Sequence, residues 1–381
     1  RLVGSEMCKR DRPEIENNGN FDGSWTERAF IGLMETSDPA SNIWEDKGFV
    51  VCSASDKGKT DYGRSSINDW EGYFKINAID PTYIITENGE HWLIYGSWHS
   101  GIAALQVNPE DGKPLNALGN PWDITGEDNS GYGKIIATRG TSRWQASEGP
   151  EVIYRDGYYY LFLAYGSLSV EYNTRVCRSK NIDGPYVDIH GNSAMGSAQL
   201  YPILTAPYRF DNSYGWVGIS HCGIFDDGAG NWFYTSQGRF PVNVGGNEYS
   251  NAIMMGHVRS IRWDANGWPL VMPERYGAVP QAPITENEIA GDWEHLALTT
   301  STGTQRTSET MTYDLGTHKI TSGSWKNATW TFDAATQTIT TSAGVVLYLQ
   351  REVDWEASPR THTIVYAAQG NQKTYWGKKL Q

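Results

Sequence analysis

Short runs of alternating apolar and polar residues recur along the chain, and they predict β-strands. The clearest run spans residues 76–107, where Asp80-Pro81 opens a first strand. Asn88-Gly89 then predicts a tight turn, because these two residues readily adopt the positive φ of a hairpin. A second strand follows at His91–Tyr95, which is rich in aromatic and apolar residues, and the segment GSWHSG leads into a third. We therefore expect a small antiparallel sheet here.

The same pattern occurs twice more, and a polar residue precedes the first strand of each copy. These residues are Asp80, Glu148 and His221, and the spacings between them are comparable. Repeats that each form a small antiparallel sheet are typical of the blades of a β-propeller. Because the innermost strands of a propeller surround one axis, we expect the three side chains to lie at one end of it.

A change in composition after Ile284 predicts a second domain. Residues 286–381 are rich in Thr, Ser and Trp and contain short alternating runs at even spacing, which is typical of a small antiparallel barrel or sandwich. We therefore predict an all-β protein with a propeller in residues 1–285 and a β-barrel domain in 286–381. The segment 1–6 resembles the end of a second strand, so we expect the first strand of that blade to precede Arg1.

Charge and composition limit the classes of ligand. The net charge of −13 argues against nucleic acid or an anionic membrane as a partner. With 16 Trp and 22 Tyr, the chain has more aromatic residues than a core needs, which favours a neutral carbohydrate. No apolar run reaches the roughly 18 residues of a membrane-spanning helix. Because the chain begins at Arg1 rather than Met, we expect a processed or cut N-terminus. We also expect a secreted, periplasmic or cell-surface protein.

The four cysteines have no CxxC spacing, which argues against a zinc cluster. A disulfide between Cys8 and Cys52 is one interpretation for an exported protein. The other, which we favour, is that most of the four are buried thiols.

Hydrolysis of a glycosidic bond requires one carboxylic acid that protonates the leaving oxygen and one base that activates water. Glu148 is the candidate acid, and Asp80 is the candidate neighbouring carboxylate. The alternative is structural, since Asp before Pro commonly opens a turn. His221 is either a core histidine or a metal contact. Trp98 and His99 either pack within a blade or contact a sugar.

Several segments together resemble glycoside hydrolase family 43, and within it the two-domain endo-1,5-α-L-arabinanases. They are NAIDPTYI, WLIYGSWHSGI, SEGPEVIYRDGYYYLF, CRSKNIDGPYVD, SQGRF and HVRSIRWDANGWPLVMPERY, followed by the stretch from IAGDWEHLAL to TYWGKK. The resemblance covers nearly the whole chain. It implies a five-bladed propeller with a C-terminal barrel, and an enzyme that cleaves arabinan with inversion.

The resemblance also assigns roles to the candidate residues. Glu148 matches the general acid, and Asp80 matches the carboxylate that tunes this acid and orients the substrate. His221 matches a histidine beside a central calcium ion, and Trp98 matches an aromatic residue that lines the substrate groove.

The general base of the family is an Asp in an HDPSI-like segment, and no segment of this chain matches it. Asp11 comes nearest to matching this Asp, but it follows the end of the first predicted strand, so we do not assign it as the general base. We expect the base to precede Arg1, or the protein to lack it.

Three functions therefore remain as hypotheses. The first is endo-acting hydrolysis of arabinan or arabino-oligosaccharides. The second is exo-acting cleavage by an α-L-arabinofuranosidase or a β-xylosidase on the same scaffold. The third is a carbohydrate-binding propeller without catalytic activity, which the unmatched base keeps open because sugar binding does not depend on proton transfer.

Overall fold

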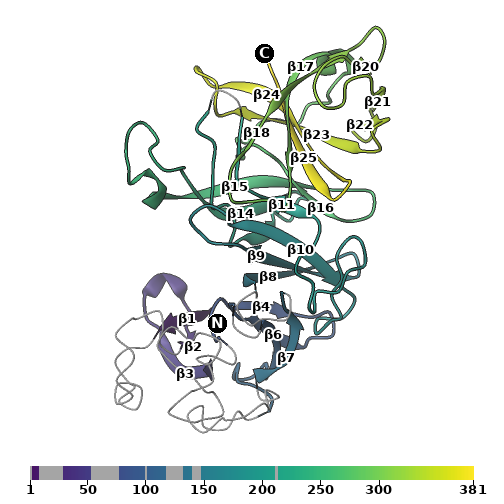
Figure 1. The fold of residues 1–381 in the computed structure, drawn as a ribbon. Helices are drawn as coiled ribbons and strands as arrows, with labels where there is room; N and C mark the ends of the chain where they lie inside the picture. Colours follow the sequence, from purple (N-terminus) through teal and green to yellow (C-terminus); the bar gives the residue numbers. More distant parts are fainter. Residues whose placement is uncertain are drawn as a thin grey trace. The chain divides into compact units, whose positions relative to one another are not determined.

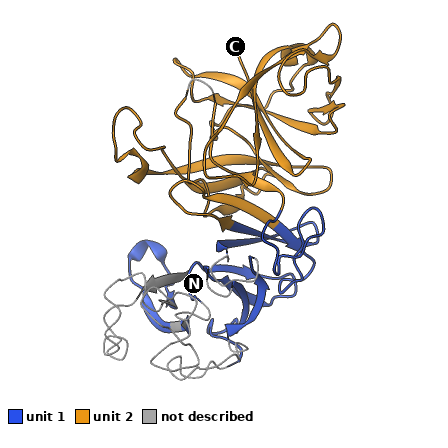
Figure 2. Cartoon of the chain, in the orientation of Figure 1, with its two compact units in different colours: residues 1–163, 177–200 blue, residues 164–176, 201–381 orange. Residues whose placement is uncertain are grey.

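The computed structural model is nearly all-β, which confirms the predicted fold class (Figure 1). It describes residues 2–7, 29–52, 77–98, 101–116, 132–139, 147–210 and 213–381. The chain divides into two compact units, residues 1–163 with 177–200 and residues 164–176 with 201–381 (Figure 2). No helix in these described ranges is both long enough and apolar enough to cross a membrane.

The first unit contains two antiparallel sheets that share one core. One sheet has the order β1 (Leu2–Met7), β2 (Ala29–Glu35) and β3 (Glu45–Cys52), and the other β4 (Thr82–Ile85), β5 (His91–Tyr95), β6 (Ile102–Val107) and β7 (Lys134–Ala137). Apolar side chains from both sheets, such as Ile31, Val51, Leu93 and Leu105, pack in a single cluster. Burial of these side chains stabilises the pair of sheets.

The hairpin predicted from Asn88-Gly89 is confirmed. The Thr86 N–H donates to the Glu90 carbonyl over 2.9 Å, and the Gly89 N–H donates to the Thr86 carbonyl over 2.9 Å. Gly89 has a φ of 77°, a conformation that glycine adopts without a steric cost. The turn sets the register of the hairpin, in which Ile84 lies opposite Trp92.

Two further four-stranded meanders follow along the chain. One contains β8 (Glu148–Arg155), β9 (Tyr158–Tyr165), β10 (Asn173–Ser179) and β11 (Ile203–Thr205); the other contains β13 (Gly223–Asp226), β14 (Trp232–Arg239), β15 (Met254–Trp263) and β16 (Pro269–Val271). Each adds its strands in chain order, as propeller blades do. The described residues thus form four sheets of this kind, so the count of five blades stays a prediction. The strand expected before Arg1 also stays a prediction.

The C-terminal part of the second unit is a nearly closed antiparallel barrel, which confirms the predicted barrel architecture. After the single-turn helix α3 (Glu286–Ile289), its strands are β17 (Gly291–Leu298), β19 (Glu309–Asp314), β20 (Lys319–Ile320), β21 (Trp330–Asp333), β22 (Thr338–Thr341), β23 (Val346–Asp354), β24 (Thr361–Gly370) and β25 (Lys373–Lys379). Their order is β20-β19-β17-β25-β24-β23-β22-β21. A bridge between Lys319 and Thr329 joins the two ends of the sheet. The short strands β12 (Tyr208–Arg209) and β18 (Arg306–Thr307) form a parallel pair beside it.

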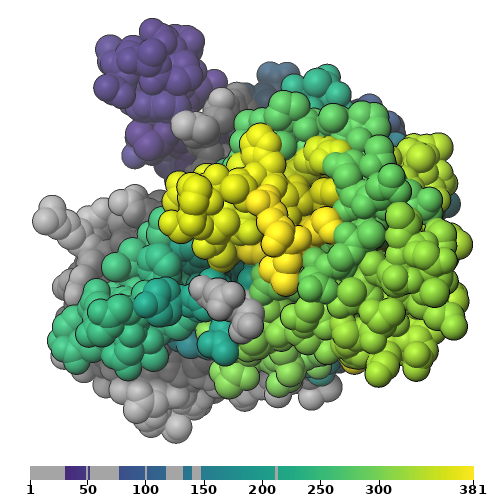
Figure 3. Space-filling view, turned by 90° about the horizontal axis from the view of Figure 1, so that it is seen from above, coloured from purple at the N-terminus to yellow at the C-terminus, as the bar shows by residue number. Residues whose placement is uncertain are grey.

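Strand β24 is buried on both faces, because alternate residues belong to two different cores of the second unit. Ile364 and Tyr366 point into the barrel interior, whereas Val365 and Ala367 pack with residues of the preceding blade such as Leu270. The period of two along a strand explains this division. In the space-filling view, the yellow C-terminal strands lie against green residues of the same unit (Figure 3). The predicted domain boundary at residues 285–286 stays a prediction.

Cys177 and Cys222 are buried thiols that form no disulfide. Cys8 and the side chain of Cys52 lie outside the described residues, so the alternative disulfide between them stays untested.

Candidate active site

Asp80 lies at the entrance to β4, and its backbone has a left-handed conformation with a φ of 55°. Its carboxylate oxygen Oδ2 accepts a hydrogen bond from the N–H of Gly149 over 3.2 Å. Gly149 is the second residue of β8 and directly follows Glu148. The structure therefore brings the Asp80 carboxylate to the point where the Glu148 strand begins.

Glu148 is partly buried, and two donors from one turn hold the same carboxylate oxygen. The Trp98 indole Nε1–H donates to Glu148 Oε2 over 2.7 Å, and the Ser97 hydroxyl donates to it over 3.1 Å. Ser97 is buried, at 2% exposure. Because both donors bind the same oxygen, these contacts fix the orientation of the Glu148 carboxyl group.

The turn that supplies these donors is hydrogen-bonded to the segments that lead into β4 and β8. The Gly96 N–H donates to the Ile79 carbonyl over 3.0 Å, and the Trp98 N–H donates to the Ser147 carbonyl over 3.0 Å. Ile79 precedes Asp80, and Ser147 precedes Glu148. The turn therefore sets the positions of both candidate carboxylates within the first unit.

Three of the predicted site residues have a left-handed backbone. Trp98 and His221 have φ values of 60° and 58°, and with Asp80 they make up three of the twelve described non-glycine residues with positive φ. Such a conformation is strained for a bulky residue such as Trp. Strain of this kind persists where the surrounding structure over-determines it, and it is concentrated at functional sites.

The left-handed positions also correct the sequence alignment of the repeats. In the second copy the left-handed residue is Gly149, with a φ of 55°, and Glu148 comes one residue earlier. Asp80, Gly149 and His221 are therefore the conformationally equivalent positions. A pattern of residue types locates a strand entrance, but it does not specify which residue there adopts positive φ.

His221 belongs to the second unit and is exposed. Its ring nitrogen Nδ1 lies 3.0 Å from the hydroxyl of Tyr172, which is 2% exposed. The structural alternative of a buried core histidine is therefore wrong. His99 lies outside the described residues, and so does Asp11.

The cluster of side chains that could bind a metal ion lies at a different place from the calcium site predicted beside His221. Among the described residues, no group of three or more His, Cys, Asp or Glu side chains includes His221. One such group exists, at Glu274, Asp354 and Glu356, whose ligand atoms lie within 4.8 Å of one another.

The Lys378 ammonium already occupies the centre of that acidic group. Its Nζ lies 3.2 Å from Glu274 Oε1, 2.9 Å from Asp354 Oδ1 and 2.7 Å from Glu356 Oε2. Burial and the neighbouring Glu356 raise the pKa of Glu274 well above its ordinary value. This group therefore forms a buried ionic network of the second unit, with a lysine in the place of a metal.

Two residues of the site were missed by sequence reasoning. Ser97 had a usable signal, because it lies in the same turn as Trp98, a predicted site residue whose indole N–H also donates to Glu148. Tyr172 had no such signal, because it lies 49 residues before His221 in the sequence and directly before a strand. A buried tyrosine near a strand is ordinarily part of a core.

Curated proteins that match this chain include two bacterial arabinanases. An extracellular endo-α-(1→5)-L-arabinanase of Bacillus subtilis strain 168 is 30% identical over 240 residues, which is 57% of this chain and 46% of that protein. One from Thermotoga petrophila is 31% identical over 239 residues, covering 58% and 46%. An extracellular exo-α-(1→5)-L-arabinofuranosidase of Cellvibrio japonicus is 26% identical over 257 residues, covering 65% and 63%. The chain spans about half the length of the first two relatives.

Solved structures show the same fold. A family 43 glycoside hydrolase from Bacillus licheniformis matches with a TM-score of 0.74 and 24% identity, over 93% of this chain and 78% of that one. The endo-1,5-α-L-arabinanase of Thermotoga petrophila matches with a TM-score of 0.73, 24% identity and the same coverages.

Family models account for both parts of the chain. A model for a C-terminal lipocalin-like domain of this family matches residues 273–377, and the model of the glycosyl hydrolases matches residues 33–269, well over half of the chain. Together with the blades and the barrel, this match shows that the chain belongs to glycosyl hydrolases family 43.

Proposed function

We propose that this chain is a glycoside hydrolase that cleaves internal α-1,5-L-arabinofuranosidic bonds of arabinan with inversion of configuration. Membership of family 43 and the endo-arabinanase names of two relatives support the proposal. The observation that carries it is the pair of carboxylates, in which Glu148 receives two side-chain donors and Asp80 is held by the next residue of the same strand.

Glu148 acts as the general acid in this proposal. When it gives its proton to the leaving oxygen, a negative charge develops on its carboxyl group. The Trp98 N–H and the Ser97 O–H point at this group, and hydrogen bonds to it strengthen as the charge develops. These two donors therefore stabilise the transition state more than the ground state, which is the requirement for raising kcat.

Asp80 orients the substrate. The Gly149 N–H holds one oxygen of its carboxylate. A carboxylate accepts several hydrogen bonds, so Asp80 can also accept from a sugar hydroxyl. Its predicted effect on the acidity of Glu148 stays a prediction.

The reaction also needs a base that activates water, at a separation of roughly 6.5–9.5 Å from the acid in inverting enzymes. We assign this role to none of the described residues. The expectation that an Asp before Arg1 supplies the base stays a prediction.

An exo-acting α-L-arabinofuranosidase is the second candidate. A relative with that name aligns with 65% of this chain. The two activities differ in whether the binding groove is open at both ends, and their products distinguish them. A β-xylosidase and a carbohydrate-binding propeller without activity remain as further alternatives.

A calcium ion beside His221 and an extracellular location complete the proposal. The exposure of the His221 ring supports contact with an ion or its waters, although calcium prefers oxygen ligands. The extracellular names of the relatives support secretion.

The test is digestion of linear debranched α-1,5-arabinan, with the products separated by size. A ladder of oligosaccharides is the expected result, whereas arabinose as the sole product favours the exo-acting alternative. Folded protein that releases no product from arabinan overturns the proposed hydrolysis by this chain.

A further inference from the structure

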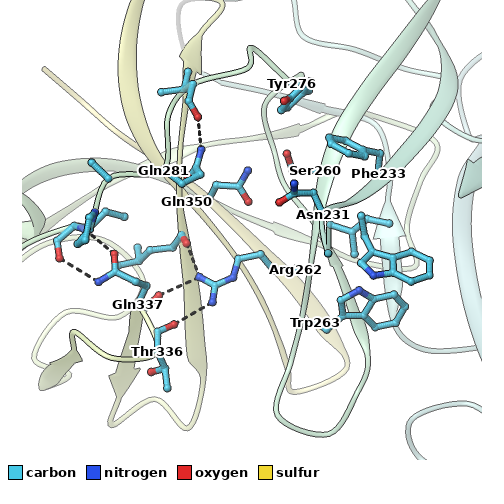
Figure 4. A pocket seen from close by; sticks show the side chains of 18 of the residues that line it. Asn231, Phe233, Ser260, Arg262, Trp263, Tyr276, Gln281, Thr336, Gln337 and Gln350 are labelled. Atoms are coloured by element: carbon cyan, nitrogen blue, oxygen red, sulfur yellow. Dashed lines mark hydrogen bonds between the residues drawn. The ribbon is translucent and has the colours of Figure 1, made fainter. Parts of the chain in front are cut away.

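A groove of about 780 Å³ lies within the second unit, and none of the residues assigned to catalysis line it (Figure 4). One wall comes from the β14–β15 hairpin, and the opposite wall comes from residues 334–337 and 349–350 of the barrel. The connecting segment between Tyr276 and Ile284 lines a third side. Its volume falls within the range of about 300–1,000 Å³ that small-molecule sites have.

Hydrogen bonds brace the two walls against each other, so the groove is formed before any ligand arrives. The Arg262 guanidinium, from β15, donates to the barrel carbonyls of Thr336 over 3.0 Å and Leu349 over 2.5 Å. Gln281 donates to the Arg351 carbonyl over 2.9 Å and accepts from its N–H over 3.0 Å. A preformed site binds with a smaller loss of conformational entropy.

Aromatic rings line the blade side of the groove and the start of the connecting segment. The Trp263 ring packs edge-on against Trp232 with centroids 5.4 Å apart, and the Tyr276 ring packs edge-on against Phe233 at 5.0 Å. Tyr276 is 41% exposed although its neighbours hold it in place. Rigid, partly exposed aromatic rings offer apolar faces on which the C–H face of a sugar can rest.

The polar groups of the groove carry no available charge. Among the described residues that line it, Arg262 alone has an ordinarily charged side chain, and that guanidinium is already bound to backbone carbonyls. The Gln350 side-chain amide lies in the groove and makes no hydrogen bond to another described residue (Figure 4). In a chain with a net charge of −13, a groove lined by aromatic rings and a neutral amide suits a neutral polyhydroxylated ligand.

From these contacts we infer that the groove is a second, non-catalytic site that binds a segment of a neutral oligosaccharide. The identity of that sugar as arabinan rests on the proposed function. Its role is to hold the polymer while the Glu148 site cleaves it, because two sites on one chain raise the effective concentration of a long substrate. A short oligosaccharide cannot gain from this effect if it fills one site only.

The experiment compares binding and hydrolysis in two groove variants, Tyr276→Ala and Gln350→Ala, with Tyr214→Ala as the control. Tyr214 is 61% exposed and does not line the groove, so its replacement removes a comparable ring. In the Glu148→Gln background, retardation in gels that contain linear arabinan reports binding without hydrolysis. In the active background, the ratio of kcat/KM on arabinan to that on a short arabino-oligosaccharide reports the contribution of the groove.

We expect each groove variant to weaken retardation about tenfold and to lower the ratio by a similar factor, as truncation of a central contact does. Tyr214→Ala leaves both values unchanged. If the parent chain cleaves arabinan and both groove variants bind and cleave it equally well, the inference about the groove is wrong, and the proposed hydrolysis is unaffected. Loss of binding in the groove variants of a chain that never cleaves arabinan supports the groove and overturns the proposed hydrolysis. A parent chain that neither binds nor cleaves arabinan overturns both.

Discussion

Replacing Trp98 with Phe separates two possible roles of this residue, contact with sugar and support of the acid. Phe keeps an aromatic ring but removes the indole N–H, which donates to Glu148 Oε2 over 2.7 Å. A hydrogen bond to a charged group contributes about 1.5–3 kcal/mol. If this bond acts fully only when Glu148 becomes ionised, its loss lowers kcat by about 10- to 100-fold with little change in KM.

The remaining donor, Ser97, sets where the effect falls in that range. Because its hydroxyl still donates over 3.1 Å, we expect Trp98→Phe alone to lie near tenfold and the double variant with Ser97→Ala to approach the upper value. Ser97→Ala alone has the smaller effect, since its bond is the longer of the two.

The assay measures kcat and KM on linear arabinan and on an arabino-oligosaccharide with a 4-nitrophenyl leaving group. A leaving group of low pKa departs without help from an acid, so support of Glu148 matters little for this substrate. We expect the loss of kcat on arabinan and near-normal kcat on the aryl substrate. Equal losses on both substrates, or a change confined to KM, would refute the reasoning and leave Trp98 as a binding platform.

Three other predictions concern stability and metal binding. Lys378→Met leaves the carboxylates of Glu274, Asp354 and Glu356 without their shared cation, so the free energy of unfolding in guanidinium should fall by about 3–5 kcal/mol; a loss below 1 kcal/mol contradicts this account. Burial lowers the pKa of His257 from 6.5 to about 2. Below pH 6.5 the His257 imidazole therefore binds a proton in the unfolded chain, whereas in the folded chain it stays neutral until the pH is much lower. Stability should therefore fall by about 3 kcal/mol between pH 7.5 and 4.5 through this residue, and an equal pH dependence of stability in His257→Gln would contradict the assignment. If calcium binds beside His221, chelation should lower the melting temperature of the parent chain but not that of His221→Ala, and equal responses count against the site.

Local turn chemistry allowed much of the fold to be predicted. Asn88-Gly89 marks a hairpin whose second strand has the predicted limits, His91–Tyr95, and β9 (Tyr158–Tyr165) likewise follows a turn at Asp156-Gly157. In both cases a glycine-containing turn and a run of aromatic residues lie close together in sequence, so no distant contact decides the outcome. The barrel could also be predicted, because apolar and polar residues alternate along its strands or the turns between them are evenly spaced.

The remaining features depend on contacts between residues far apart in sequence. The Trp98 indole reaches Glu148 across 50 positions, and no local pattern specifies the direction of that side chain. The left-handed position in the second repeat is Gly149 rather than Glu148 for the same reason, because the surrounding structure imposes it. The acidic residues around Lys378 come from three different segments, so they resemble ordinary surface charges in the sequence.

The central claim is that this chain cleaves arabinan with Glu148 as the acid. The most direct measurement compares hydrolysis of linear arabinan by the parent chain and by Glu148→Gln, which keeps the size of the side chain but cannot give up a proton. The account predicts an oligosaccharide ladder from the parent chain and a loss of at least about 100-fold in the variant, the lower limit for general acid catalysis. A folded Glu148→Gln chain that retains most of the parent activity would contradict it.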